Sequence, residues 1–194
     1  MSDAAHCQDQ VAGSYTPMMS SEDTEDLRRW HERAYQERRA QAVRDQIFDY
    51  LGLSIVVPPD VQPVTGVSHL LGEAVLAEVE AAEKVLDMGT GSGINAILAA
   101  SQGAQVIAVD VNPHALEATW ANADRNGIGD RIEIRRSDVF STVDEVFDLI
   151  IFDPPFRWFT PRDLLEAATA DKDYRVLTTF SGRPEIISLP AEGC

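Results

Sequence analysis

The stretch "KVLDMGTGSG" (residues 84–93) changes from an apolar run to glycines at alternate positions. An apolar run such as 84–89 is typical of a strand that is buried on both faces of a sheet. The glycines favour a tight turn and let a ligand approach the backbone closely. A helix is predicted over residues 93–101. The stretch therefore predicts a strand, a ligand-binding loop and a helix.

The same alternation of buried strand and helix continues beyond residue 101. A helix is predicted over 112–127, and further strands over 104–110, 131–138 and 147–153. Continuous apolar strands that alternate with helices indicate a parallel sheet covered on both faces. The predicted fold class is α/β, with a Rossmann-like, doubly wound, mostly parallel sheet.

The segments before residue 84 differ in character. Residues 1–22 contain no Lys or Arg and show little apolar periodicity, which predicts an acidic, disordered tail. A helix is predicted over 23–52, with Gly52 at its end. One domain is predicted over 53–194. It begins with a short strand and a proline-broken loop in 53–66, and a helix over 68–80 follows.

The charge and the cysteines limit the function classes. The 194 residues carry a formal net charge of -16, which disfavours indiscriminate binding to nucleic acid or to an anionic membrane. Cys7 and Cys194 show neither a disulfide framework nor a metal spacing. No signal peptide and no membrane span is apparent. We expect a cytoplasmic protein without a metal site and without membrane contact.

Two acids near the glycine loop limit the class of ligand that the loop can be expected to bind. Asp110 lies 21 residues after Gly89, at the end of the second predicted strand, where nucleotide-type sites place an acid on the ribose hydroxyls. The loop reads G-x-G-x-G, not the G-x-G-x-x-G of dinucleotide enzymes. Asp87 just before it suits a cationic or amino-bearing ligand better than a pyrophosphate. Both features argue against a nicotinamide-dependent oxidoreductase.

The stretch "VLDMGTGSG" (85–93) resembles motif I of the class I S-adenosylmethionine-dependent methyltransferases. The resemblance implies that the loop shapes the methionine pocket, that Asp110 holds the ribose and that Asp138 and Val139 contact the adenine. Asp110 could instead cap the next helix, and Asp138 could cap a turn. The implied cofactor is S-adenosyl-L-methionine, and the implied loop residues are Asp87 (near the amino group), Gly89, Thr90, Gly91 and Gly93.

The fourth strand ends in "DPPF" (153–156), which resembles the [Asn/Asp]-Pro-Pro-[Tyr/Phe/Trp] signature of methyltransferases that modify planar nitrogen. The carboxylate of Asp153 and the backbone carbonyl of Pro154 can each accept an N–H hydrogen bond from such a nitrogen. Pro154 and Pro155 fix the turn, so both acceptors are preorganised. Phe156 can stack on the planar group. The alternative is a strand-terminating turn with a core phenylalanine.

Residues 58–72 resemble the entry loop of the small-domain methyltransferases, a group that includes release-factor glutamine and ribosomal-RNA guanine enzymes. The resemblance implies an N-methyltransferase that acts on a planar amide or amine nitrogen of a protein or small molecule. A non-catalytic cofactor-binding scaffold is one alternative. An RNA-base methyltransferase is another, with RNA held by Arg28, Arg29, Arg33, Arg38, Arg39 and Arg44.

The C-terminal part of the domain is predicted to be short. Helical segments are expected after Thr160, and one short strand at 185–189. The family sheet has seven strands, so the final strands are missing or minimal here and an edge strand is exposed. We expect this edge to be covered by a partner, by a second copy in a homodimer or by the N-terminal helix. Otherwise the chain is a truncated, poorly active form.

Overall fold

The computed structural model describes residues 19–183 and residue 186. It divides into two compact units, Met1–Ala40 and Gln41–Cys194, which are described separately. Residues 1–18 of the predicted tail lie outside the described residues. No helix in the described ranges is both long and apolar enough to cross a membrane.

The first unit contains helix α1 (Ser21–Gln41). Ser20 caps this helix. Its hydroxyl accepts a hydrogen bond from the N–H of Asp23, and the Asp23 carboxylate accepts one from the N–H of Ser20. This reciprocal pair satisfies two backbone donors that a helix start leaves free.

The predicted helix over 23–52 is wrong beyond residue 41, because residues 46–57 form an antiparallel hairpin. Strands β1 (Gln46–Tyr50) and β2 (Leu53–Val57) pair through the turn at Leu51 and Gly52. Both turn residues have positive φ, 47° and 84°, which is the geometry of a two-residue hairpin turn. Gly52 therefore closes a hairpin and does not end a helix.

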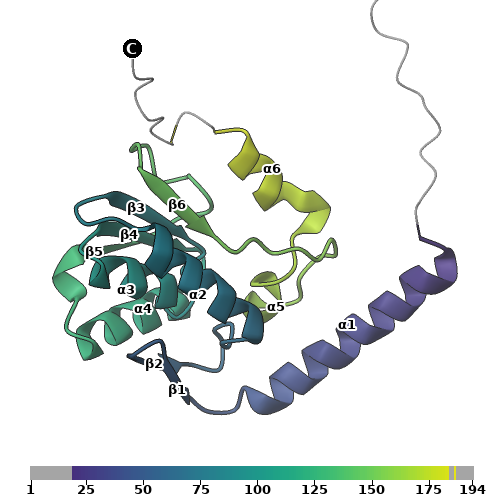
Figure 1. The fold of residues 1–194 in the computed structure, drawn as a ribbon. Helices are drawn as coiled ribbons and strands as arrows, with labels where there is room; N and C mark the ends of the chain where they lie inside the picture. The colour runs from purple at the N-terminus through teal and green to yellow at the C-terminus, as the bar shows by residue number, and fades with distance from the viewer. Residues whose placement is uncertain (1–18, 184–185, 187–194) are drawn as a thin grey trace, which may run out of the picture. The chain divides into compact units, whose positions relative to one another are not determined.

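The predicted parallel sheet is confirmed. Its four strands lie in the order β5-β4-β3-β6, and neighbouring strands are parallel (Figure 1). The doubly wound order places β3 and β6 side by side although they are far apart in sequence. The strands are β3 (Lys84–Met88), β4 (Gln105–Asp110), β5 (Ile132–Arg136) and β6 (Leu149–Phe152).

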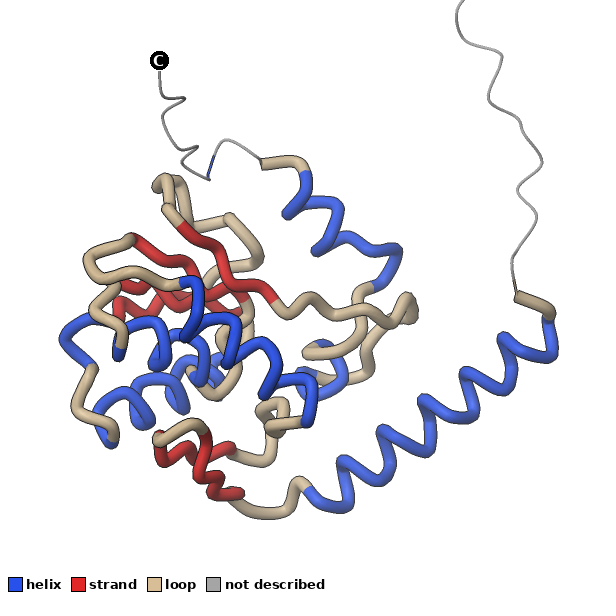
Figure 2. The backbone as a smooth tube through the Cα atoms, in the orientation of Figure 1, coloured by secondary structure: helices blue, strands red, loops and turns tan. Residues whose placement is uncertain are grey.

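Helices cover both faces of the sheet (Figure 2). One face, with Val85 and Val106, packs against α2 (Gly66–Glu78), α3 (Ile94–Ser101) and α4 (Pro113–Arg125). The other face, with Leu86 and Ile107, packs against Val176 and Phe180 of α6 (Arg175–Ser181). Neighbouring residues of one strand thus face opposite layers, which explains why the strands are apolar without interruption.

The chain after β6 is irregular. The helix expected after Thr160 begins after Asp163, whose side chain accepts from the N–H of Glu166 at the start of α5 (Leu164–Ala167). The 3-10 turns η1 (Gly129–Arg131) and η2 (Lys172–Tyr174) complete the regular elements of the described part. The predicted strand 185–189 lies outside the described residues except for Ile186, which is buried and accepts a hydrogen bond from the N–H of Phe147.

Candidate active site

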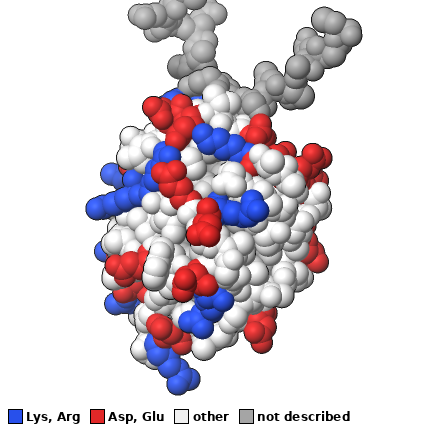
Figure 3. Space-filling view, turned by 90° about the vertical axis from the view of Figure 1, so that its left-hand side faces the viewer, with Lys and Arg blue, Asp and Glu red and all other residues white. Residues whose placement is uncertain are grey.

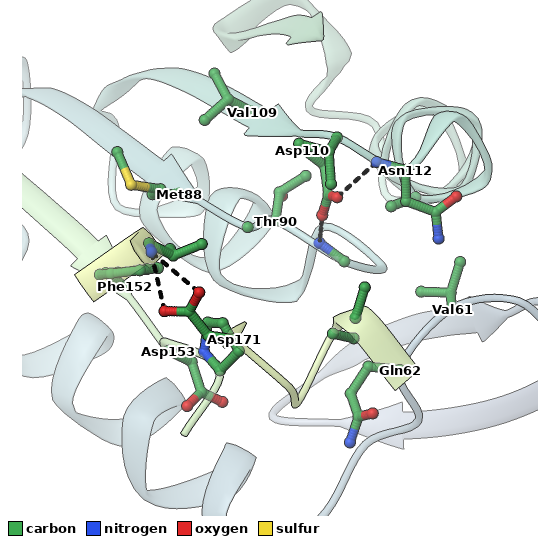
Figure 4. Close-up of a pocket in the computed structure, with 18 of the residues that line it drawn as sticks. Val61, Gln62, Met88, Thr90, Val109, Asp110, Asn112, Phe152, Asp153 and Asp171 are labelled. Atoms are coloured by element: carbon green, nitrogen blue, oxygen red, sulfur yellow. Dashed lines mark hydrogen bonds between the residues drawn. The ribbon is translucent and has the colours of Figure 1, made fainter. Parts of the chain in front are cut away.

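A cavity of about 610 Å³ opens at the carboxyl ends of the four parallel strands (Figure 4). Open α/β sheets bind their ligands at this edge. The cavity walls come from the glycine loop after β3, the ends of β4, β5 and β6, the loop after β2, the start of α2, and residues 161–176. All of these belong to the second unit of the chain.

The glycine loop forms one wall. Gly89 and Gly91 line the cavity with φ angles of 73° and 58°. The N–H groups of Gly89 and Thr90 both donate to the carbonyl of Val109, which ties the loop to β4. A Cβ atom on Gly89 would meet no protein atom within 4 Å. The loop therefore leaves space next to its backbone that a ligand can occupy.

Gly93 does not line the cavity, although the sequence assigned it to the cofactor site. A Cβ atom there would lie 2.9 Å from the Cα of Thr119, and its φ is 84°. The glycine allows the start of α3 to pack closely against α4.

Asp87 also lies outside the cavity lining, beneath the loop. Its carboxylate accepts from the hydroxyl of Thr90 at 2.6 Å and from the N–H of Ala96 at 3.1 Å. The pKa of Asp87 is raised from its ordinary 3.8 to about 6, chiefly by burial and to a smaller extent by the nearby Asp110, although the bonds from Thr90 and Ala96 oppose this rise. Asp87 holds the loop on α3, and Thr90 faces the cavity.

Asp110 lines the cavity at the end of β4, as predicted. Its two carboxylate oxygens accept from the N–H groups of Gly91 at 3.0 Å and Asn112 at 2.9 Å. Burial raises its pKa, and these backbone donors lower it. Each oxygen has a second lone pair, so Asp110 shapes the loop and can still accept from a ligand hydroxyl.

Asp138 and Val139 follow β5 and both line the cavity. The Asp138 carboxylate forms a bidentate pair with Arg175. Val139 is buried and has a φ of 52°. This backbone region is strained for a β-branched residue, at a cost of about 1–3 kcal/mol. The hydroxyl of Ser137 donates to the carbonyl of Val139 and helps to hold it there.

The acid-Pro-Pro-aromatic turn lies beside the glycine loop, because Phe152 of β6 is in register with Met88 of β3. Asp153 and Pro155 line the cavity, whereas Pro154 and Phe156 do not. Partial burial raises the pKa of Asp153. Phe156 is 60% exposed, so it is not the core residue of the alternative interpretation.

The backbone of Arg157 fixes the end of this turn. Its N–H donates to the carbonyl of Thr169, and its own carbonyl accepts from the N–H of Asp171. The Asp171 carboxylate in turn accepts from the N–H groups of Val176 and Leu177 at the start of α6. The turn is thus connected to the segment that closes the side of the cavity near Asp171 (Figure 4).

Two cavity residues, Gln62 and Asn95, were not found from the sequence. Each has a side-chain oxygen that is buried and accepts no hydrogen bond in the described part of the chain. The sequence feature that could have pointed to Asn95 is its polar side chain next to the buried positions 94, 96 and 97. Gln62 lies in a proline-broken loop, where a sequence pattern gives no direction to a side chain. Arg175 and the other cavity-lining residues between 161 and 176 were also missed.

Comparison with known proteins identifies the family. The model of the methyltransferase small domain family matches residues 65–168, more than half of the chain. The chain belongs to this family. The resemblance seen in the sequence is therefore confirmed, and S-adenosylmethionine is the cofactor that membership of this family implies.

Curated relatives match over the same region. A ribosomal protein L11 methyltransferase of Thermosipho africanus is 52% identical over 34% of this chain and 25% of its own length. A release factor glutamine methyltransferase of Cereibacter sphaeroides is 45% identical over 43% of this chain and 30% of its own length. A ribosomal protein uL3 glutamine methyltransferase of Bradyrhizobium diazoefficiens is 44% identical over 39% of this chain and 25% of its own length. The chain spans less than a third of these three relatives.

Solved structures share the fold. The tRNA m1G37 methyltransferase of M. jannaschii matches with a TM-score of 0.52 and 26% identity, over 59% of this chain and 37% of that one. The aTrm5–tRNALeu complex matches with a TM-score of 0.59 over 75% of this chain and 38% of that one. Its identity of 20% supports the fold alone.

The cavity residues fit S-adenosylmethionine. The loop leaves open space beside Gly89, and Asp110 can accept from a ribose hydroxyl. The lining contains five acidic and two basic side chains, which favours a ligand with a positive centre such as a sulfonium. The acids are Asp110, Asp138, Asp153, Asp171 and Asp173, and the bases are Lys172 and Arg175.

Proposed function

We propose that this chain carries the active site of an N-methyltransferase that methylates a planar amide nitrogen, most favourably a glutamine side chain of a protein. One observation supports this proposal above the others. The Asp153-to-Phe156 turn follows β6 directly beside the glycine loop of β3. A nitrogen held by Asp153 would then lie next to a cofactor held by the loop.

The residues of the turn suit a poor nucleophile. The lone pair of an amide nitrogen is delocalised, so the nitrogen must be oriented and made more pyramidal before it can attack. The Asp153 carboxylate and the Pro154 carbonyl can accept its two N–H groups, and the prolines keep both acceptors in place. The exposed Phe156 ring offers a flat apolar surface to an incoming amide.

S-adenosylmethionine, when bound, supplies a methyl group on a positively charged sulfur. Transfer would form a nitrogen–carbon bond to the substrate and break the carbon–sulfur bond of the cofactor, which would be left as a neutral thioether. The methylated nitrogen becomes acidic only at this stage. Asp153 can therefore accept its proton without acting as a strong base earlier.

The proposed protein substrate is supported by two of the relatives, which are named as glutamine methyltransferases. The net charge of -16 points the same way, because it does not favour nucleic acid. A small-molecule amide or amine fits the same turn. We also propose a homodimer and a cytoplasmic location. Light scattering, which measures the molar mass in solution, tests the homodimer.

An RNA base is the second candidate, because a similar solved structure is a tRNA methyltransferase. The charge distribution does not favour it. Arg28 and Arg29 pair with acids of the same helix, Glu25 and Asp26. Lys and Arg side chains are interspersed with Asp and Glu on the face in Figure 3. RNA binding would show a steep decrease of affinity with salt, and we expect none.

The test uses purified protein and labelled S-adenosylmethionine. Calorimetry first establishes whether the cofactor binds. Methyl transfer is then measured with a glutamine-bearing protein factor, for wild type and for Asp153→Ala. We expect transfer by wild type only, with cofactor affinity similar in both. Cofactor binding without transfer to any protein, RNA or small molecule would indicate the non-catalytic scaffold instead.

A further inference from the structure

Two side chains of helix α4 hold the glycine loop from behind. The Oγ1 of Thr119 donates to the carbonyl of Gly91 at 3.3 Å, and the Nδ2 of Asn122 donates to the carbonyl of Ser92 at 2.8 Å. Gly91 and Ser92 both line the cavity, whereas Thr119 and Asn122 are fully buried and do not. The loop that forms one wall of the cavity is thus bonded from positions outside the cavity lining.

An asparagine is an unusual choice for a fully buried position of a helix, because an apolar side chain would pack there without hydrogen-bond partners. Asn122 has partners on two segments. Its amide nitrogen donates to the carbonyls of Val56 at 2.8 Å and Ser92 at 2.8 Å, and its oxygen accepts from the N–H of Val56 at 2.9 Å. A buried polar group whose bonds are all made favours one arrangement of the segments that it joins. These segments are β2 and the glycine loop.

The glycine loop benefits from such a support because its own backbone is flexible. Gly91 and Gly93 have positive φ angles of 58° and 84° and carry no Cβ, so the peptide groups between them can rotate at little cost. The two carbonyls that α4 bonds belong to these peptide groups. The C=O and N–H of a trans peptide point in opposite directions, so the bond to Gly91 also turns the N–H of Ser92 away from α4. Thr119 and Asn122 therefore help to determine how the loop presents its backbone to the cavity.

The nearby Asn126 makes the same contact with the hairpin but not the contact with the loop. It accepts from the N–H of Ser54 at 3.1 Å and donates to the carbonyl of Ser54 at 3.1 Å, as Asn122 does with Val56. It also donates to the backbone carbonyl of Asn122. Within the described part of the chain, no hydrogen bond joins Asn126 to the glycine loop. Asn126 therefore offers a control that separates support of the hairpin from support of the loop.

We propose that Thr119 and Asn122 are positioning residues of the cofactor site, which hold the glycine loop in its binding arrangement without touching the cofactor. This inference rests on the proposed function. Asn122 is itself bonded to Val56, so the β1–β2 hairpin supports the cofactor site through this side chain. No residue of the hairpin, 46–57, lines the cavity in the described structure, and its contribution to binding is indirect.

The experiment measures binding of S-adenosylhomocysteine to the full chain by calorimetry. It compares wild type with Asn122→Ala, Thr119→Val and the control Asn126→Ala. Thr119→Val keeps the shape of the side chain and removes the hydroxyl, so it tests the proposal even if Asn122→Ala does not fold. Thermal unfolding of each ligand-free protein gives a temperature at which the compared proteins are folded. Hydrogen exchange of a peptide that contains residues 89–93 is recorded without ligand.

We expect Asn122→Ala to weaken S-adenosylhomocysteine binding roughly tenfold and Thr119→Val roughly threefold, because the bond from Thr119 is the longer of the two. Asn126→Ala should unfold at a lower temperature, because it loses its bonds to β2, but its affinity should change less than twofold. Exchange in the 89–93 peptide should be faster in Asn122→Ala and Thr119→Val and unchanged in Asn126→Ala.

Unchanged affinity and exchange in both Asn122→Ala and Thr119→Val would overturn the assignment. An equal loss of affinity in Asn126→Ala would do so too, because the effect would then come from the stability of the hairpin. A failure of the proposed function gives a different result. Wild type itself would then not bind S-adenosylhomocysteine, while exchange in the 89–93 peptide would still decide whether the two side chains hold the loop.

Discussion

Arg175 donates to both carboxylate oxygens of Asp138, through nitrogen–oxygen contacts of 3.0 and 3.1 Å. Asp138 is the acid that the family resemblance assigns to the adenine amine. The pair therefore places a protein cation where a ligand donor would bind, and the two compete for the same oxygens. Both side chains are half exposed, so the pair itself stabilises the protein little.

Removal of the competing cation is expected to strengthen cofactor binding. An exposed ion pair is worth at most about 1 kcal/mol, so Arg175→Ala should bind S-adenosylmethionine roughly two- to fivefold more tightly. Calorimetry at low and high salt measures this, and the difference from wild type should shrink as salt screens the pair. Weaker binding by the variant would mean that Arg175 contacts the cofactor directly.

Two glycines of one loop should respond differently to alanine. In Gly93→Ala the new Cβ would lie 2.9 Å from Thr119, so the variant should lose about 2 kcal/mol or more of unfolding free energy. In Gly89→Ala the Cβ meets no protein atom, so only the backbone cost of about 1 kcal/mol is expected. Gly89→Ala should, however, weaken cofactor binding, because the methyl occupies ligand space.

Urea unfolding and calorimetry on both variants separate these effects. If Gly93→Ala kept wild-type stability and lost cofactor affinity, the assignment of Gly93 to helix packing would be wrong.

The sequence predicts the sheet well because parallel strands buried on both faces are apolar throughout. It predicts 84–89 and 147–153, and the structure has β3 at Lys84–Met88 and β6 at Leu149–Phe152. Residues 46–50 were misassigned to a helix because Ile47 and Tyr50 continue a helical spacing. Long-range contacts decide that segment, and no local pattern shows them.

The contacts that fix the hairpin come from α4. The Asn122 side chain accepts from the N–H of Val56 and donates to its carbonyl, and Asn126 does the same for Ser54. Two amide side chains one helical turn apart thus hydrogen-bond the backbone N–H and C=O groups of β2, as the backbone of a neighbouring strand would. Asn122 also donates to Ser92 in the glycine loop. Such bonds across more than 60 residues cannot be read from a sequence.

The candidate site was only partly predictable for a similar reason. The motif places Asp87 and Gly93 near the cofactor, but it does not distinguish residues that line a cavity from residues that support its wall. Asp110 and Asp153 do line the cavity, because the end of a strand fixes where they lie.

Asp87 should make stability depend on pH. Its pKa rises from 3.8 unfolded to about 6 folded, so between these values the folded protein binds more protons than the unfolded chain. The contribution of Asp87 is therefore most favourable below about pH 4 and decreases as pH rises to about 6, by on the order of 3 kcal/mol.

Asp87→Asn removes the buried charge and keeps an oxygen for Thr90 and Ala96. We expect the variant to be as stable as wild type or more so at neutral pH, with a smaller decrease of stability across this pH window. Urea titrations of both proteins at several pH values measure the difference. A variant that is less stable at neutral pH would show that the charge itself is required.

Asp153 should act through its acceptor oxygens. Asp153→Ala is expected to lower methyl transfer about 100-fold, and Asp153→Asn, which keeps one acceptor, about tenfold. The pKa of Asp153 is raised, so this carboxylate becomes protonated at a higher pH than an ordinary aspartate does. As the pH is lowered, methyl transfer by wild type should therefore begin to decrease at a correspondingly higher pH. Asp153→Asn should lack this decrease. Equal activity of all three proteins would remove Asp153 from the site.

The central claim is methyl transfer to a planar amide nitrogen. Labelled S-adenosylmethionine is incubated with the protein and with extract from cells that lack the gene, and the products are separated into protein, RNA and small molecules. We expect label in protein, released as methylamine by acid hydrolysis because the methyl lies on an amide, and none with Asp153→Ala. Label in RNA, or label in protein that acid does not release, would contradict the claim.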